Sequence, residues 1–340
     1  MFKLNGLRRF LPVLMVAGTC FLSGCYFAIP TMVETVNQNR NIAEAEGAAL
    51  ESYTGAIKLF EQTDGNQQVN AYVRGYNSMM VGQWSLMPSY HVLTTKTMKA
   101  DGRSAIPYPM VKGLESGIQQ FRQGLALRTE EPSELDTAVQ EAVTAAEKLL
   151  LDEKTSLPYF RNQGYRQDDM RGAKTVLPIL KGDYDRLIAV MNRIGDQLLV
   201  LQKQETERRV QVYADSHDRV GYYAEQCLLD AQDLMAFLKQ DDIYKKRIGY
   251  QYADVQIQEL NRSLDGLKSA VSKSSASWDE HKGLGGMYTQ LHGLVELYQG
   301  LKQGQRSVSY NRMMRRYSDA VMQYNAVVEA KTSIGSTSSN

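Results

Sequence analysis

Apolar residues recur at intervals of three and four through the middle of the chain, and this spacing constrains the fold more than any other feature. The longest run lies between residues 183 and 240, where one helix side would carry Leu187, Met191, Ile194, Leu198, Leu201, Val220, Ala224, Cys227, Ala231, Leu234 and Leu238. Polar residues 202–209 interrupt the run, and the apolar side resumes after them in a shifted phase. The spacing predicts one helix of about 85 Å, either straight or bent at the interruption.

Shorter segments have the same helical period, and none alternates apolar and polar residues between turns as a half-buried strand does. Thr31 and Glu34 have the spacing of a capping box, which predicts a helix from about residue 31. That helix would carry Val36, Ala43, Leu50, Tyr53, Ile57 and Phe60 on its apolar side. Further helices are expected after the break at Asp64–Gly65, over 113–128, from an N-cap at Ser133, over about 260–271 and from Ser277, with a loop over 99–112. The predicted fold class is therefore all-α, an elongated helical bundle with long antiparallel helices.

The first 25 residues have the three parts of a bacterial lipoprotein signal. A basic start is followed by an apolar stretch over 11–22, and Leu22-Ser23-Gly24-Cys25 then matches the lipobox. The apolar stretch is shorter than the ~20 residues that span a bilayer. We therefore expect residues 1–24 to be a cleaved signal peptide and Cys25 to be lipidated. An ordinary cleaved signal with a coincidental cysteine is the alternative.

The residues around Cys25 also indicate where the protein resides. Tyr26 stands where an Asp would retain a lipoprotein in the inner membrane of enteric-type bacteria, so we expect the outer membrane, with the body in the periplasm. Residues 25–30 would form a tether that reaches only about 20 Å when fully extended. The helical bundle domain is expected over 31–330 and a disordered, Ser-rich tail over 331–340.

The charge balance excludes one class of partner. The chain has 39 Lys and Arg against 38 Asp and Glu, and three of the basic residues lie in the signal, so the mature body is slightly acidic. A general nucleic-acid binder would need a clustered basic excess, so no nucleic-acid partner is expected. Attachment to the membrane would rest on acyl chains at Cys25. Cys227 would then be the remaining thiol, and its apolar helical neighbours indicate a buried small residue.

Residues that could bind a metal or react with a substrate are scattered along the sequence. The histidines His91, His217, His281 and His292 form no closely spaced pair, although metal sites need converging ligands. Thioethers can bind Cu(I), but core packing is the preferred interpretation of Met79, Met80, Met87 and Met98. No phosphate-binding loop and no nucleophile elbow occurs in the sequence. We therefore predict that the protein is not an enzyme and has no cofactor and no metal site.

Short charged runs have a structural explanation in the predicted helices. The acidic pairs are expected near helix starts, where carboxylates offset the positive end of the helix dipole: Asp168–Asp169, Asp183 with Asp185, and Asp241–Asp242. The basic runs are expected on solvated helix faces: Arg208–Arg209, Lys245–Arg247 and Arg315–Arg316.

The last predicted helix has an aromatic face. Its positions step by four and three, which places on one side Tyr310, Met314, Tyr317, Val321, Tyr324 and Val328. One interpretation makes Tyr310, Tyr317 and Tyr324 an interaction face for a ligand or partner. The other, which we prefer, docks this face on the bundle, with the hydroxyl groups reaching a hydrated rim.

Several short motifs resemble one family. They are Tyr72-x-x-x-Tyr76-Asn77, the Asp168–Asp169 segment leading to Gly172 and Lys174, the pair Tyr222–Tyr223, and Tyr317 with Tyr324–Asn325. In order and spacing, from about residue 66 to 328, they resemble the YiiG-like bacterial lipoproteins, a family of unknown function. The resemblance implies export, lipidation and a helical body, and transfers no active site.

Two functions remain open from the sequence. The first is a non-catalytic, membrane-anchored lipoprotein of the cell envelope with an interaction or structural role, held by the anchor at Cys25 and binding an envelope protein. The second is a module that holds a small apolar or aromatic ligand between its helices.

Overall fold

The structure is a computed structural model, and it describes residues 55–81, 85–95, 111–240, 243–246, 249–274, 278, 282–305 and 307–337. All of them belong to the unit Asn41–Asn340. Within these ranges the regular structure is helical and no strand occurs, which confirms the all-α fold class. None of the helices in the described ranges combines the length and apolarity needed to cross a bilayer. The signal peptide, Cys25, the tether, most of the 99–112 loop and the start at Ser277 lie outside the described residues.

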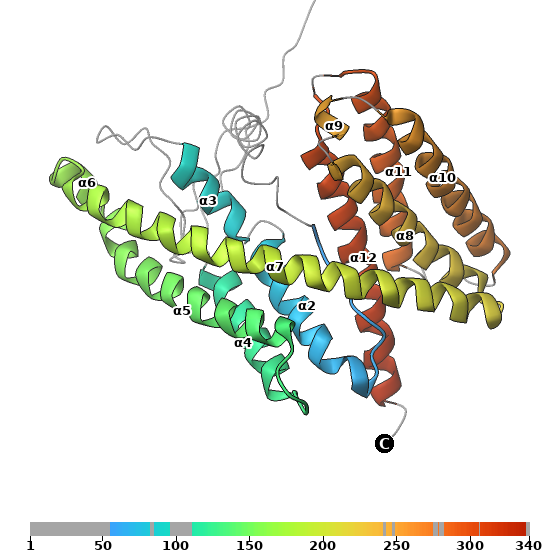
Figure 1. The fold of residues 1–340 in the computed structure, drawn as a ribbon, viewed down its shortest axis with the longest axis horizontal. Helices are drawn as coiled ribbons and strands as arrows, with labels where there is room; N and C mark the ends of the chain where they lie inside the picture. The colour runs from blue at the N-terminus through green and yellow to red at the C-terminus, as the bar shows by residue number, and fades with distance from the viewer. Residues whose placement is uncertain are drawn as a thin grey trace, which may run out of the picture. The chain divides into compact units, whose positions relative to one another are not determined.

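The first half of the body is a set of helices packed in chain order. Helix α2 (Gln67–Met80) packs on α4 (Val111–Ala126), α4 on α5 (Glu134–Arg161), and α5 on α7 (Arg171–Asp215), while α3 (Leu86–Thr95) also lies against α7 (Figure 1). Short turns, η2 (Asp64–Asn66) and α6 (Gly164–Gln167), precede α2 and α7. The expected N-cap at Ser133 is confirmed, because Ser133 Oγ accepts from Asp136 N–H. Asp136 Oδ2 also accepts from Ser133 N–H, which completes a capping box.

Glycines allow α2 and α4 to approach closely. A Cβ on Gly75 would lie 2.4 Å from the Phe121 ring, and one on Gly124 would lie 2.4 Å from the Tyr72 ring. Both aromatic rings are buried and pack edge to face. The mid-helix glycines are therefore explained by side chains of the opposing helix that occupy the space of the missing Cβ.

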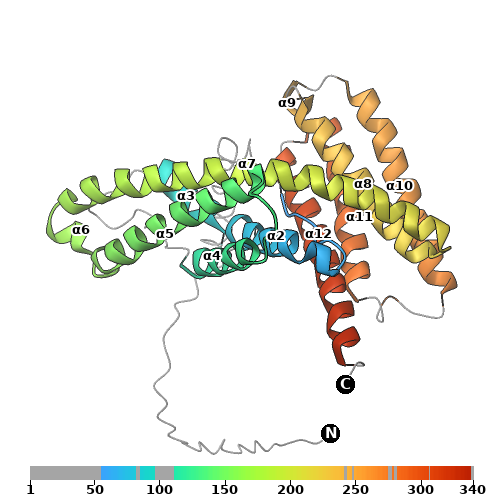
Figure 2. The same ribbon diagram turned by 60° about the horizontal axis from the view of Figure 1, so that its bottom comes forward.

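The predicted single helix over 183–240 is wrong, because the chain reverses between two helices. Helix α7 continues unbroken through the polar interruption and ends at Asp215, and α8 (Arg219–Lys239) folds back at an angle and packs against it (Figure 2). His217 adopts a left-handed conformation with φ of 60°, and Asp218 caps α8 by accepting from Gly221 N–H at 2.9 Å. A three-residue turn with a capping carboxylate is enough to separate two helices whose apolar faces are similar.

The second half of the body is built on α8. Helix α10 (Tyr250–Lys273) packs on α8, α11 (Lys282–Lys302) packs along α12 (Tyr310–Thr337), and α12 also contacts α8, while α9 (Ile243–Lys246) is a single turn. The helix expected over 260–271 is confirmed as part of α10. Helix α12 continues to Thr337, so it ends later than the sequence predicts. Its aromatic face lies inside the fold, because all six of its residues are buried.

Residues 55–62 form no helix and run as a drawn-out chain, so the predicted helix carrying Ile57 and Phe60 is wrong at its C-terminal end (Figure 1). Gly55 to Phe60 are buried without interruption. A helix would bury one side of such a segment, whereas six consecutive buried residues require that the chain be enclosed on all sides. The segment (blue in Figure 1) passes beside α12 and joins α2 through the η2 turn.

Candidate functional site

Residues 56–60, named here the core segment, are held by side chains of the surrounding helices. Five consecutive backbone N–H groups each donate to one side-chain oxygen: Ala56 to Ser318 Oγ at 3.1 Å, Ile57 to Asn77 Oδ1 at 2.9 Å, Lys58 to Gln202 Oε1 at 2.5 Å, Leu59 to Asn325 Oδ1 at 2.7 Å and Phe60 to Asn70 Oδ1 at 2.8 Å. The acceptors come from α2, α7 and α12. The helices therefore hold the core segment through its main chain, as a binding protein holds a peptide.

The asparagines around the core segment also donate hydrogen bonds. Asn70 Nδ2 donates to Phe60 O at 3.2 Å, and Asn77 Nδ2 donates to Ile57 O at 2.8 Å. Each of these amides thus pairs with the N–H and the C=O of a single residue, which is how a neighbouring strand would pair. Asn325 Nδ2 adds a bond to Ile57 O at 3.0 Å. Because buried backbone groups must be paired, these amides explain how an irregular segment lies in the core.

A buried ionic cluster fixes the middle of the core segment. Lys58 Nζ lies 2.6 Å from Glu225 Oε2, with the two side chains 1 % and 0 % exposed. Arg209 Nε lies 2.7 Å from the other carboxylate oxygen, to which the Tyr324 hydroxyl donates at 2.6 Å. The Arg209 guanidinium also donates to the Tyr213 hydroxyl. Two cations from distant parts of the chain therefore share one carboxylate inside the fold.

The two neighbouring cations favour the ionised form of Glu225. Burial alone would raise the pKa of Glu225, but the charges of Lys58 and Arg209 outweigh burial and lower that pKa below its ordinary value. Burial lowers the pKa of Lys58, while the adjacent Glu225 opposes the shift. Burial and Glu225 together raise the pKa of Tyr324 well above its ordinary value, so its hydroxyl remains a donor. The arrangement can hold an ammonium group in a site closed to water.

The expectation that Arg208–Arg209 lies on a solvated face is wrong for Arg209. Arg208 is half exposed and pairs with Glu205 and Glu61, whereas the Arg209 side chain is 7 % exposed. Consecutive residues point about 100° apart around a helix, so one of an adjacent pair can face solvent while the other faces the core. The other described basic residues of these runs, Lys245, Lys246, Arg315 and Arg316, are exposed as predicted.

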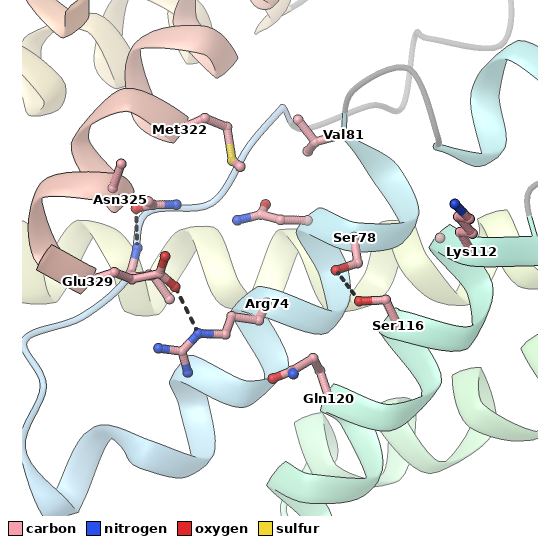
Figure 3. A pocket seen from close by; sticks show the side chains of 13 residues that line it. Arg74, Ser78, Val81, Lys112, Ser116, Gln120, Met322, Asn325 and Glu329 are labelled. Atoms are coloured by element: carbon pink, nitrogen blue, oxygen red, sulfur yellow. Dashed lines mark hydrogen bonds and ion pairs between the residues drawn. The ribbon is translucent and has the colours of Figure 1, made fainter. Parts of the chain in front are cut away.

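A cavity of about 550 Å³ lies beside the core segment, between α2, α4 and α12 (Figure 3). Leu59, Asn77 and Asn325 form the wall that it shares with the core segment. Arg74 on α2 and Glu329 on α12 point toward one another across it and form an ion pair at 3.1 Å. On the α4 side the cavity opens to solvent, because Lys112 and Ser116 are exposed.

The lining of this cavity mixes charge, amides and apolar surface. Ser78 and Ser116 are hydrogen-bonded at 3.2 Å along the α2–α4 side, and Gln120 lies nearby (Figure 3). Val81 and Met322 supply apolar surface. This combination suits a polar partner such as a peptide or protein loop better than a purely apolar molecule.

A second cavity, of about 330 Å³, connects the predicted tyrosine face to α7 and α8. Tyr310, Met314 and Tyr317 line it together with Leu199 and Met235, and Asp196, Lys239 and Gln240 add polar groups. The Tyr310 hydroxyl donates to Met235 O at 3.2 Å, and Gln202 Nε2 donates to the Tyr317 hydroxyl at 3.2 Å. Tyr324 lies in the ionic cluster instead, so the structure divides the three tyrosines between two places.

Other residues singled out in the sequence have separate positions. Met79, Met80 and Met87 are buried in the core, Cys227 is a buried free thiol, and Met98 lies outside the described residues. His217 and His292 are exposed. In the described part of the chain, no three His, Cys, Asp or Glu side chains converge as metal ligands.

The acidic pairs differ from one another. Asp168 accepts from Gly172 N–H at 2.8 Å in the first turn of α7, as expected, and this bond lowers its pKa. The prediction for Asp183 and Asp185 is wrong, because α7 begins at Arg171 and both lie inside it. There Asp183 pairs with Lys148 and Asp185 with Lys181. The pair Asp241–Asp242 lies outside the described residues.

The residues that hold the core segment are not among those that the sequence patterns predict as functional. A usable signal exists in two of them, because Glu225 and Asn325 are polar residues at positions where the helical spacing predicts an apolar face. Asn325 lies four residues after Val321 and three before Val328, and Glu225 lies three before Leu228. Lys58 carries no such signal, since its neighbours suggest a helix that the structure does not form.

One comparison with known proteins gives a match. A family model described as "Protein of unknown function (DUF3829)" matches residues 63–296, which include most of α2 to α11. No curated protein and no solved structure matches the chain.

Proposed function

The chain belongs to the family of proteins of unknown function DUF3829, and from this premise we propose that it is a lipid-anchored, non-catalytic interaction protein of the bacterial cell envelope. In this proposal Cys25 carries the lipid, the outer membrane holds the anchor, and the helical body binds an envelope protein from the periplasmic side. Within the family we assign the chain to the YiiG-like lipoproteins. No enzymatic step and no cofactor is part of the proposal.

The burial of the ionic cluster is the observation that supports a non-catalytic role. Lys58, Arg209 and Glu225 could together perform acid–base chemistry, but their side chains are at most 7 % exposed and are bonded to one another. Their partners fix the core segment, so a substrate would have to displace part of the fold to reach them. The cluster therefore supports a role in holding structure together.

The cavity beside the core segment supports binding of a partner. It is open to solvent and offers an ion pair, amides and hydroxyls on three helices within one hollow. A protruding loop or chain end of a partner protein would find hydrogen-bond donors, acceptors and apolar contact there.

One experiment in living cells tests both the lipid anchor at Cys25 and partner binding at the cavity. The photoreactive residue p-benzoylphenylalanine is placed at Gln120 in the cavity and, as a matched control, at Leu151, which is 64 % exposed on α5 away from the cavity lining. We expect a discrete crosslinked species from position 120 and none of the same mass from position 151. The Cys25→Ala change should abolish fatty-acid labelling and remove the crosslink. Identical products from both positions, or labelling that survives Cys25→Ala, would contradict the proposal.

A second function is favoured by the smaller cavity. Tyr310 and Tyr317 present aromatic surface, and Met235 and Met314 present polarizable apolar surface, around a space of about 330 Å³. This suits a small aromatic or apolar ligand held between α7, α8 and α12. Native mass spectrometry of protein purified from its host would detect such a ligand as a stoichiometric mass increment that the Ala236→Trp variant, with the space filled, lacks.

A further inference from the structure

The core segment is bound by groups that recognise a peptide main chain. Each acceptor for the backbone N–H groups of residues 56–60 is a side-chain oxygen, and two carbonyl groups of the segment accept from asparagines. Main-chain groups are the same in every peptide. The surrounding helices therefore select an extended conformation at these positions more strongly than they select particular side chains.

Two positions do select residue type. Gly55 has φ of 80°, and a Cβ there would lie 2.6 Å from Met314 Sδ and 3.0 Å from Ser318 Oγ, so glycine is required. Lys58 is the second, because Glu225 offers it a buried carboxylate at 2.6 Å. Within the enclosed sequence Gly-Ala-Ile-Lys-Leu-Phe, the glycine is therefore selected by backbone conformation and the lysine, three residues later, by charge.

The helices also require an occupant at this place. Without the core segment, the side-chain amides of Asn70, Asn77 and Asn325 would lose these hydrogen bonds. Gln202 and Glu225 would each lose one of their buried partners. Buried polar groups without partners are strongly disfavoured. A space lined in this way favours an extended peptide over water or an apolar ligand.

We propose that the space around residues 55–60, named here the segment channel, is an exchangeable binding site for an extended peptide of the form Gly-small-apolar-Lys-apolar-aromatic, and that the chain's own segment is its intramolecular occupant. A partner peptide of the same chemistry binds when the chain's own segment leaves. This binding site rests on the proposed function only in that the body is a binding module. It deepens that function by naming the class of partner.

An intramolecular occupant competes at an effective concentration of about millimolar, so exchange is measured best when the chain's own segment is weakened. The full mature chain, purified in detergent, carries Lys58→Met, which keeps the apolar stem and removes the charge for Glu225. The probe is a fluorescein-labelled, C-terminally amidated peptide with the sequence of residues 55–62. The control is the same peptide with Met in place of its lysine.

We expect the lysine peptide to bind the Lys58→Met protein, measured by fluorescence anisotropy, at least tenfold more tightly than the control peptide, and to raise the thermal midpoint of that protein. The wild-type protein should bind the lysine peptide at least tenfold more weakly, because its own Lys58 occupies the Glu225 site. Equal binding of the two peptides, or no binding by the variant at 1 mM peptide, would overturn the proposal.

A second variant covers the case in which Lys58→Met does not fold. Gly55→Val strains the chain's own segment through the left-handed φ and the Met314 contact, and leaves Glu225 and all the amide partners in place. The same preference for the lysine peptide is expected, and its absence in this variant counts equally against exchange. Failure here is distinct from failure of the proposed function, because lipid labelling and the crosslink at Gln120 do not depend on an added peptide.

Discussion

Removing Glu225 should destabilise the fold far more than removing Lys58, although the two residues form one ion pair. The cluster contains two cations, Lys58 and Arg209, and a single carboxylate between them. In Glu225→Gln both cations remain buried without a counter-charge. In Lys58→Met, Arg209 stays 2.7 Å from Glu225, and the Tyr324 hydroxyl still donates to it.

The expected magnitudes follow from this difference. Leaving a buried charge without its partner costs about 3–5 kcal/mol, which we expect for Glu225→Gln. Lys58→Met loses a charge-assisted hydrogen bond of about 1.5–3 kcal/mol but also relieves the burial of an ammonium group, so its net cost should be about 1–2 kcal/mol. Glu225→Gln is expected to cost more than Lys58→Met because the cluster has two cations and one carboxylate.

The assay is urea unfolding at pH 7, monitored by far-UV circular dichroism. The slope of unfolding free energy against urea concentration must be the same in each variant, so that differences in midpoint report differences in stability. A matched control comes from Lys154 and Glu115, whose ion pair has the same 2.6 Å distance but half-exposed side chains. Glu115→Gln should change the free energy of unfolding by less than about 1 kcal/mol. If Lys58→Met costs as much as Glu225→Gln, the shared-carboxylate reasoning is wrong.

Four further predictions follow from burial, packing, helix propensity and titration. Tyr317→Ala should lower the free energy of unfolding by about 3–5 kcal/mol, because its ring is 1 % exposed; an unchanged thermal midpoint would place the ring outside the core. Gly75→Ala should destabilise by about 1–3 kcal/mol, since its Cβ would meet the Phe121 ring at 2.4 Å. Gly182→Ala, a helix interior site with no atom within 4 Å of the added Cβ, should stabilise by up to about 1 kcal/mol, and denaturant midpoints separate these two outcomes. Folding lowers the pKa of Glu225 below its ordinary value of 4.5, so the stability that the Glu225 carboxylate contributes is fully present above pH 4.5 and is lost as pH falls through the pKa of the folded state. The difference in unfolding free energy between wild type and Glu225→Gln should therefore shrink below pH 4.5. A difference that stays constant below pH 4.5 would contradict the ionised state assigned to Glu225.

The sequence predicts helices well where one face is apolar and the ends carry local signals. The capping box at Ser133 and the apolar spacing of α10 and α12 follow from residues within a few positions of each other. The turn at Ser216–Asp218 was missed because the apolar faces of α7 and α8 have similar spacing, and neither glycine nor proline marks the reversal. The spacing therefore predicts one helix over 183–240, although Asp218 is a capping residue within it.

The conformation of the core segment cannot be predicted from its neighbours in sequence, for a different reason. Its seven-residue spacing with upstream apolar residues favours a helix, and its true conformation depends on acceptors at positions 70, 77, 202, 318 and 325. These partners are separated from it by up to 266 residues. Only the assembled helices bring them together, so the propensity of the segment is overridden by tertiary contacts.

The cavity and the segment channel share two residues, and this gives the proposed partner sites a thermodynamic relation. Asn77 and Asn325 hold the core segment with their side-chain amides and also line the cavity. A partner in the cavity that binds better when these amides are fixed would strengthen retention of the chain's own segment, and retention would strengthen that partner by the same factor. The core segment follows the expected anchor at Cys25 and contacts α2, α7, α8 and α12. Occupancy of the cavity and attachment of the body to its N-terminal chain would then be coupled through these two asparagines and through Leu59, which lines the cavity itself.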